Sequence, residues 1–147
     1  MTSRPTTLTA RTIGETENAL QAILRKSLDD SGLEYHDWIA LKLVSEIQPP
    51  ITRKAAVEEM VNGLKVSEEA ATQVIDGLQA EDVLTQYGDH HLTTTSQGTA
   101  LYQDLNEKIG SNARRMWDGI TPDDLVTAYQ VLTTIKDRAN AILGSGT

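Results

Sequence analysis

The clearest structural pattern in this chain runs from Leu64 to Gly98 and reads LKVSEEAATQVIDGLQAEDVLTQYGDHHLTTTSQG. Ser67 is suited to start a helix, because its hydroxyl can accept a hydrogen bond from a backbone N–H of the first turn. Apolar residues at helical spacing follow it, namely Ala70, Ala71, Val74, Ile75 and Leu78. Two short β-favouring runs come next, Val83 to Gln86 and His91 to Thr94, with the polar turn Tyr87 to His90 between them. The pattern predicts a helix followed by a β-hairpin.

A second helix is predicted directly before this one. Its apolar positions also have helical spacing, and they are Ala55, Val57, Met60, Val61 and Leu64. Thr52 is the predicted N-cap of this helix, and its end is expected at Asn62-Gly63 or just after. Only Lys65-Val66 then separate it from Ser67. Such a short connection is typical of a helix-turn-helix, and the hairpin that follows predicts a winged helix-turn-helix.

The residues that carry a family resemblance are Ser67, Thr72, Ile75-Asp76-x-Leu78, Val83-Leu84 and Thr95-Ser96-Gln97-Gly98. They resemble the MarR (multiple antibiotic resistance regulator) family of dimeric winged-helix repressors. In that family the recognition helix ends in an Asp-x-Leu signature, a wing follows, and a Leu-Thr-x-x-Gly element opens the next long helix. The resemblance implies a mainly α fold with a small β-hairpin wing, in which N- and C-terminal helices flank the winged unit and join two subunits.

On this basis we expect one MarR-like domain over residues 1–147, with an N-terminal arm (1–12), a winged helix-turn-helix (33–97) and dimerisation helices (13–32 and 98–147). Helices are predicted from Ile13 to Leu28 and from about Glu34 to Glu46, before the break at Pro49-Pro50. After the wing, Thr95 or Ser96 caps a long helix with a kink predicted at Gly110-Ser111. The sequence Thr121-Pro122-Asp123-Asp124 opens a last helix that runs to about Leu143.

The composition limits the classes of protein to consider. Apolar residues make up 39% and charged residues 23% of the 147 residues, which is typical of a soluble globular domain. No apolar run approaches the roughly 18 residues that span a bilayer, and no secretory signal is evident at the N-terminus, so a cytoplasmic location is expected. Cysteine is absent. That excludes disulfides, thiolate metal sites and the cysteine-based peroxide sensing of some MarR-type proteins.

Neither a metal site nor a catalytic site is predicted. Asp89-His90-His91, together with His36, contains ligand-type side chains, but adjacent histidines on a strand point to opposite faces and rarely share an ion. The sequence holds no nucleophile–base motif, no Gly-rich phosphate loop and no HExxH motif. We therefore expect a protein that is not an enzyme and that carries no cofactor.

The charge of the chain conflicts with DNA binding. The net charge is −8 and the pI is about 4.8. From Leu33 to Gln97 there are four basic residues and eleven acidic ones, so the winged unit alone carries −7. Neutralisation of phosphates by Lys and Arg supplies much of the affinity of most DNA-binding proteins. An acidic winged unit therefore favours a second possibility, a protein-interaction module.

Candidate DNA contacts are spread over the two helices and the wing. The full set is Arg53, Lys54, Lys65, Ser67, Glu68, Thr72, Gln73, Gln86 and His90. The basic residues are expected to contact phosphates, whereas Thr72, Gln73 and Glu68 could contact base edges in the major groove. The chain departs from the family at Gln73 and Gln86, where arginine is common, and at Asp82, where glycine is usual. Its wing is also shorter and lacks the Asp-x-Arg tip.

Two further sets of residues follow from the resemblance. An effector crevice for a small aromatic ligand would be bordered by Arg25, Tyr35, His36 and Trp38, although the favoured interpretation of Trp38 itself is a core residue. Dimer contacts are expected from a set of apolar residues on the first and last helices, Leu20, Leu24, Leu125, Tyr129, Leu132, Ile135 and Leu143. The alternative for the last helix is packing within one chain, against the first helix.

The sequence therefore predicts a DNA-binding transcriptional regulator. It would act as a homodimer on a palindromic operator, as a repressor that releases double-stranded DNA when a small aromatic effector binds. No membrane partner is expected. The alternative is an acidic winged-helix dimer that has lost its affinity for DNA and binds a basic protein partner. A fold of this kind does not by itself decide between the two.

Overall fold

The computed structural model describes residues 6–47 and 49–144, and it divides into two compact units, Met1–Gly110 and Ser111–Thr147. Each unit is described by itself. The elements in chain order are α1 (Ala10–Ser27), α2 (Tyr35–Glu46), β1 (Ile51–Thr52), α3 (Arg53–Leu64), α4 (Glu68–Ala80), β2 (Leu84–Tyr87), β3 (His91–Thr94), α5 (Ser96–Trp117) and α6 (Pro122–Gly144). This order confirms the predicted fold class, a mainly α chain with a winged helix-turn-helix. The predicted arm lies partly outside the described residues, because these begin at residue 6.

The first two helices begin where side chains cap them. Helix α1 starts at Ala10, three residues before the predicted start, because the hydroxyl of Thr9 accepts a hydrogen bond from the backbone N–H of Thr12 at 3.2 Å. Helix α2 follows Glu34, which forms a capping box with Asp37. In that box the Asp37 carboxylate accepts from the backbone N–H of Glu34 at 2.9 Å.

The helix-turn-helix has the caps that the sequence predicts. Thr52 accepts from the backbone N–H of Ala55 at the start of α3, and Ser67 accepts from that of Ala70 at the start of α4, both at 3.0 Å. Lys65 ends α3 in the left-handed region, with φ of +56°. The chain thus reverses within three residues. Such a turn places the two helices in contact, as a helix-turn-helix requires.

The wing contains one strand more than the sequence predicts. The sheet has the order β1-β3-β2 and both pairs are antiparallel, with Ile51 opposite Leu92 and Thr52 opposite His91. A strand of two residues is too short to show an alternating pattern, and its partner lies about forty residues further along the chain. Strand β2 also extends to Tyr87, one residue beyond the predicted end. The hairpin turn is therefore limited to residues 88–90.

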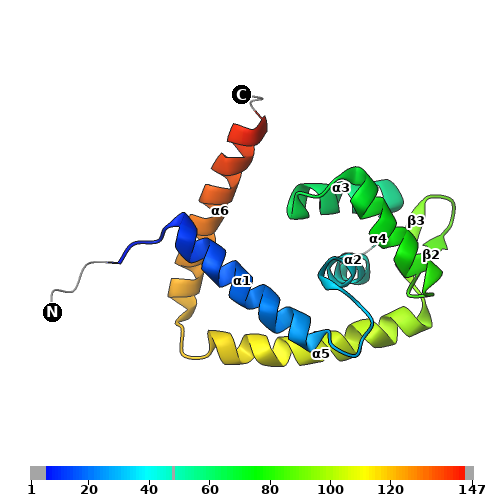
Figure 1. The fold of residues 1–147 in the computed structure, drawn as a ribbon, viewed down its shortest axis with the longest axis horizontal. Coiled ribbons are helices and arrows are strands. Elements are labelled where there is room, and N and C mark those ends of the chain that lie inside the picture. The colour runs from blue at the N-terminus through cyan, green and yellow to red at the C-terminus, as the bar shows by residue number, and fades with distance from the viewer. Residues whose placement is uncertain (1–5, 48, 145–147) are drawn as a thin grey trace. The chain divides into compact units, whose positions relative to one another are not determined.

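Helix α2 is central to the first unit. It contacts α1, α3, α4 and β3, and Figure 1 shows it nearly end-on, with α3 and α4 on one side and α5 on the other. The core is built from small and aliphatic side chains and one tryptophan: Leu28, Trp38, Ala40, Leu41, Val44, Ile51, Ala56, Val57, Met60, Ala71, Ile75, Leu78, Val83, Leu84, Leu92 and Leu105. Because this set is buried in one cluster, α4 and the wing rest on the same core.

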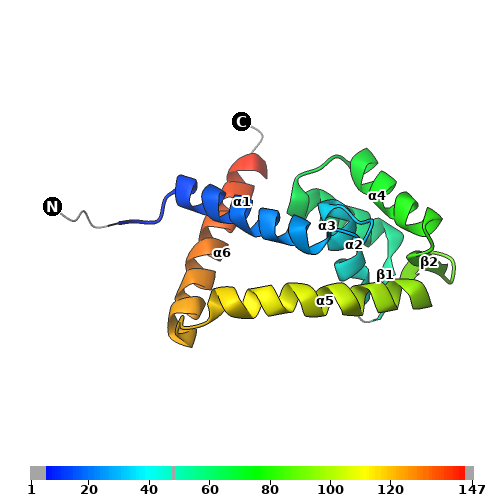
Figure 2. The same cartoon turned by 60° about the horizontal axis from the view of Figure 1, so that its bottom comes forward.

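The start of α5 is fixed to the wing by a close backbone contact. Thr95 caps the helix, because its hydroxyl accepts from the backbone N–H of Gly98 at 2.9 Å. A Cβ atom at Gly98 would lie only 2.0 Å from the carbonyl oxygen of Val83. This position therefore requires glycine, which gives a physical reason for the glycine of the Thr-x-x-Gly element. Figure 2 shows the strands beside this end of α5.

The second unit consists of the last turns of α5 and helix α6. Helix α5 continues as α-helix through Gly110-Ser111, where the division between the units falls. Thr121 accepts from the backbone N–H of Asp124 at 3.2 Å, so the predicted start of α6 is confirmed. No described residue of α6 is buried, and Tyr129, Ile142 and Leu143 are 70%, 68% and 68% exposed.

Hydropathy gives no sign of a transmembrane helix. Within residues 6–47 and 49–144, every helix is too short or too polar to cross a bilayer.

Candidate nucleic-acid interface

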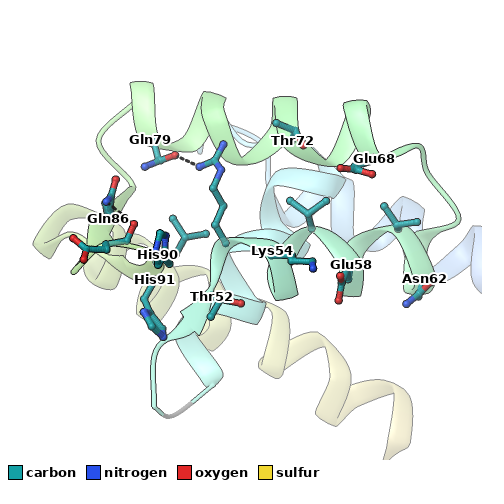
Figure 3. A pocket seen from close by; sticks show the side chains of 15 residues that line it. Thr52, Lys54, Glu58, Asn62, Glu68, Thr72, Gln79, Gln86, His90 and His91 are labelled. Atoms are coloured by element: carbon teal, nitrogen blue, oxygen red, sulfur yellow. Dashed lines mark hydrogen bonds between the residues drawn. The ribbon is translucent and has the colours of Figure 1, made fainter.

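Helices α3 and α4 and the wing enclose an open groove of about 770 Å³. Figure 3 shows Lys54, Glu58 and Asn62 along α3, Glu68 and Thr72 on α4 opposite them, and His90 and His91 at the wing. The apolar residues that line the groove are Val57, Val61 and Leu92. The groove lies between the two elements that a winged helix uses on a duplex, the recognition helix and the wing.

The predicted reading face of α4 is exposed. Ala71, Ile75 and Leu78 are buried in the core, and Val74 packs against it. Glu68, Glu69, Gln73 and Asp76 are exposed, whereas Thr72 is half-buried at the edge of the groove. A polar face with an amide and a hydroxyl could contact base edges in a major groove. The same face carries three carboxylates, which would repel phosphates.

The N-terminus of α4 presents groups suited to a phosphate, although its side chains are mostly acidic. The Ser67 hydroxyl accepts a hydrogen bond from the first turn and still has its own proton to donate. Lys65 precedes it and is exposed. Glu68 and Glu69 lie in the first turn, where the helix dipole stabilises negatively charged side chains. These two carboxylates would compete with a phosphate for the N-terminus of the helix.

Arg53 and Lys54 begin α3 but have different surroundings. The Arg53 guanidinium forms an ion pair with Asp76 and donates a hydrogen bond to Gln79, both on α4. The dashed line at Gln79 in Figure 3 marks the second contact. Lys54 is exposed, and within the described part of the chain it forms no ion pair. No local pattern predicts the contacts of Arg53, because the partners are 23 and 26 residues away.

The wing is held by its own side chains and by the start of α3. Gln86 donates from Nε2 to the carbonyl oxygens of Gly88 at 2.9 Å and Asp89 at 3.0 Å, so its amide closes the turn. The backbone N–H of Arg53 donates to the carbonyl oxygen of His90 at 2.9 Å. His90 is exposed at the tip, whereas His91 is half-buried. Gln86 is therefore engaged within the wing, and His90 is the freer of these two predicted DNA contacts.

Metal-ligand side chains do not gather at this turn. Within the part of the chain that the structure describes, no three His, Asp or Glu residues are placed to hold an ion.

The sequence matches no family model and no curated protein, but the structure matches many solved ones. A MarR-family transcriptional regulator from Rhodococcus sp. RHA1 is 15% identical, with a TM-score of 0.70 over 89% of this chain and 98% of that one. The transcriptional regulator SlyA is 18% identical, with a TM-score of 0.72 over 88% and 92%. CouR from Rhodococcus jostii RHA1, bound to p-coumaroyl-CoA, is 14% identical, with a TM-score of 0.70 over 85% and 88%. The chain has the MarR-family winged-helix fold.

In this MarR-type fold the four predicted effector residues have different environments. Trp38 is buried in the core, 2% exposed, and stacks on Tyr102 with ring centroids 5.8 Å apart. Tyr35 is half-buried and lies beside the exposed His36. Burial and the charge of Glu17 raise the pKa of Tyr35, while Arg25 acts in the opposite direction. The charge of Arg25 on α1 thus acts on Tyr35 on α2, and Trp38 is a core residue.

Tyr102 links α5 to α2 through Glu46. The Tyr102 hydroxyl donates to the Glu46 carboxylate at 2.6 Å, and Lys42 donates to the same oxygen at 2.7 Å. Burial and the hydrogen bond to Glu46 raise the pKa of Tyr102 to about 12. Burial raises the pKa of the Glu46 carboxyl, but the hydrogen bonds from Lys42 and Tyr102 outweigh it and leave the pKa below its ordinary value. No sequence pattern predicted this cluster, because Tyr102 lies 56 residues beyond Glu46.

The predicted dimer residues are accessible to different degrees. On α6, Tyr129, Leu132 and Ile135 are 70%, 44% and 42% exposed, Leu143 is exposed, and Leu125 is half-buried. On α1, Leu20 and Leu24 are half-buried, and Leu24 packs against the core of the first unit. The α6 residues share one face of the helix, opposite Thr127 and Gln130.

Proposed function

We propose that this protein is a DNA-binding transcriptional regulator that acts as a homodimer on a palindromic operator. One observation carries the proposal: α4 presents the exposed Gln73 and the half-buried Thr72 beside a paired β-hairpin, on a core that fixes both elements. This is the arrangement that lets a winged helix place one helix in the major groove and its wing on the neighbouring backbone. The solved MarR-family structures named above support the same class of function.

The proposed contacts fall into two groups. Thr72, Gln73 and Glu68 contact base edges, since a glutamine can pair with adenine and a glutamate can accept from cytosine. The second group contacts phosphates and comes from the exposed cations, the N-terminus of α4 and the wing, namely Lys54, Lys65, Ser67, Gln86 and His90. Arg53 belongs to the same interface, but its guanidinium is engaged by Asp76 and Gln79. So few cations predict weak, salt-sensitive binding.

The proposed dimer is formed by the flanking helices. The apolar face of α6, with Leu132 and Ile135 at its middle, is exposed. A helix that exposes such a face is stabilised by burying it against a partner, and a second copy with the same face gives a closed two-fold dimer. A two-fold axis places two recognition helices on successive turns of a duplex, which suits a palindromic site. We propose that this regulator works in the cytoplasm, where its operator would lie.

We propose that the regulator is a repressor released by a small aromatic effector. Arg25 is on α1, Tyr35 and His36 are neighbours on α2, and the charge of Arg25 acts on the Tyr35 hydroxyl. A cation next to aromatic rings is suited to an aromatic ligand with an anionic group. That the CouR structure contains p-coumaroyl-CoA supports an effector of this kind.

The test is binding of the purified protein to a labelled duplex of its own upstream region at low salt. The double variant Thr72→Ala/Gln73→Ala should bind at least tenfold more weakly, because both base-edge contacts are removed. The double variant Thr127→Ala/Gln130→Ala is the matched control, since it removes the same side chains from the polar face of α6, and it should bind like the wild type. Equal binding by all three proteins would contradict the recognition-helix part of the proposal.

A second function is favoured by the charge of the winged unit. Its net charge of −7 and the engagement of Arg53 by Asp76 leave few cations for a duplex. In this alternative the dimer binds a basic protein through the acidic face of α4. It predicts no retardation of any duplex at low salt and binding to a cationic partner that weakens as salt rises.

A further inference from the structure

The two adjacent cations at the start of α3 differ in what they contact. The Arg53 side chain is 36% exposed, and its guanidinium forms an ion pair with Asp76 and a hydrogen bond with Gln79. Lys54 follows it, is exposed, and forms no ion pair within the described residues. Both would serve as phosphate contacts if charge and position alone counted. Their surroundings indicate different tasks.

Arg53 connects three elements of the winged unit. Its backbone N–H donates to the His90 carbonyl oxygen at the wing tip, at 2.9 Å. It is the first residue of α3, next to the capping residue Thr52. Its side chain reaches α4 at Asp76 and Gln79, which are three residues apart and share a helix face. The wing, α3 and α4 therefore meet at one residue.

We propose that Arg53 is a positioning residue, which fixes the recognition helix relative to the wing and keeps its ion pair with Asp76 when DNA is bound. Lys54 then supplies the phosphate contact at the start of α3. This inference rests on the proposed function, because it assigns separate roles to two residues of that interface.

The charge balance supports this assignment. If Arg53 turned to a phosphate, Asp76 would be left as an unpaired carboxylate on the face of α4 that approaches the duplex, and it would repel the backbone. With the pair intact, Arg53 neutralises that carboxylate. The guanidinium can serve both acceptors because it presents several N–H donors in a fixed plane, which a lysine cannot do.

The first experiment measures DNA affinity against salt for the full chain and the variants Arg53→Gln, Arg53→Lys and Lys54→Gln. For Lys54→Gln, the slope of log K against log salt should fall by about 0.9 for each phosphate that is no longer neutralised. Arg53→Gln should weaken binding about tenfold with the slope unchanged, and Arg53→Lys should weaken it nearly as much, because a lysine cannot also reach Gln79. A reduced slope for Arg53→Gln, or full binding by Arg53→Lys, would overturn the proposal.

The second experiment needs no DNA and uses thermal unfolding of Arg53→Gln, Asp76→Asn and the double variant. A positioning pair predicts non-additive shifts in Tm, with the double variant close to the less stable single variant. Additive shifts would overturn the positioning role. If the wild type binds no duplex, the proposed function fails, while this cycle still decides whether Arg53 joins α3 to α4. The two failures are therefore distinguishable.

Discussion

The two units of the molecule bury their apolar side chains to very different degrees. Among the described residues, every buried apolar side chain lies at or before Leu105, in the first unit. Nine of the twelve large apolar side chains that are exposed in the described chain lie in the second unit, from Trp117 to Leu143. The first unit buries most of its large apolar side chains in its own core. Helix α6 instead exposes its apolar side chains, as a helix that forms an interface does before its partner binds.

This difference separates the roles of the two regions. A unit with a closed core can hold a recognition helix and a wing in fixed positions, since packed interiors deform little. A helix with an exposed apolar face gains most of its stability from what it packs against, because helices in proteins are stabilised mainly by tertiary packing of an amphipathic face. Under the proposed function, the first unit supplies the contacts to DNA and the second supplies the partner subunit.

The largest expected effect comes from placing charge on α6. Leu132→Asp/Ile135→Asp should raise the Kd of the proposed dimer about a thousandfold, or about 4 kcal/mol, because two carboxylates per subunit would enter an apolar interface. Analytical ultracentrifugation measures the change. The control is Thr127→Asp/Gln130→Asp, on the opposite face of α6, which should stay dimeric. An unchanged mass for the first variant would contradict the assignment of α6 to the interface.

A somewhat smaller effect is expected within the first unit, at Gly98. Gly98→Ala should reduce the free energy of unfolding by about 3 kcal/mol, because a methyl group would clash with the Val83 carbonyl and separate α5 from the wing. Urea unfolding measures it. Gly77→Ala, in the middle of α4 with no atom within 4 Å of the added group, is the matched control and should stabilise the protein slightly. An equal change in the free energy of unfolding for the two variants would contradict the role of the close contact between Gly98 and the Val83 carbonyl.

The smallest effect is expected at the link between α5 and α2. Tyr102→Phe should lower stability by about 1 kcal/mol at pH 7, since it removes a partly exposed, charge-assisted hydrogen bond to Glu46. The lowered pKa of Glu46 means that the carboxylate stabilises the fold above its unperturbed pKa of 4.5, and that this stabilisation disappears as the pH falls through the lowered value. The difference in Tm between wild type and variant should therefore shrink on acidification, and a pH-independent difference would contradict the role of Glu46.

The helices and the hairpin were predictable because their signals are local. Thr52, Ser67 and Thr121 cap helices as predicted, since each accepts a hydrogen bond from a backbone N–H three residues on. Strand β1 and the contacts of Arg53 were not predictable. Their partners lie from 23 to about forty residues away, and no periodicity marks them.

The candidate site was predicted in part. The exposed face of α4 follows from the spacing of Ala71, Ile75 and Leu78. Asp82 stands where the family has glycine. Its φ of +61° lies in the left-handed region that favours glycine, so the turn keeps this backbone conformation although the residue differs. That these residues contact DNA remains a prediction.

The sequence by itself determined the order of the helices, their caps, the hairpin and the acidic character of the winged unit, because these depend on neighbouring residues and on composition. Only the tertiary structure decided that Arg53 pairs with α4 and not with solvent, that Gly98 meets the Val83 carbonyl, and that Trp38 stacks on Tyr102. The physical reason is distance along the chain. Each of these contacts joins residues that come together only when the elements pack.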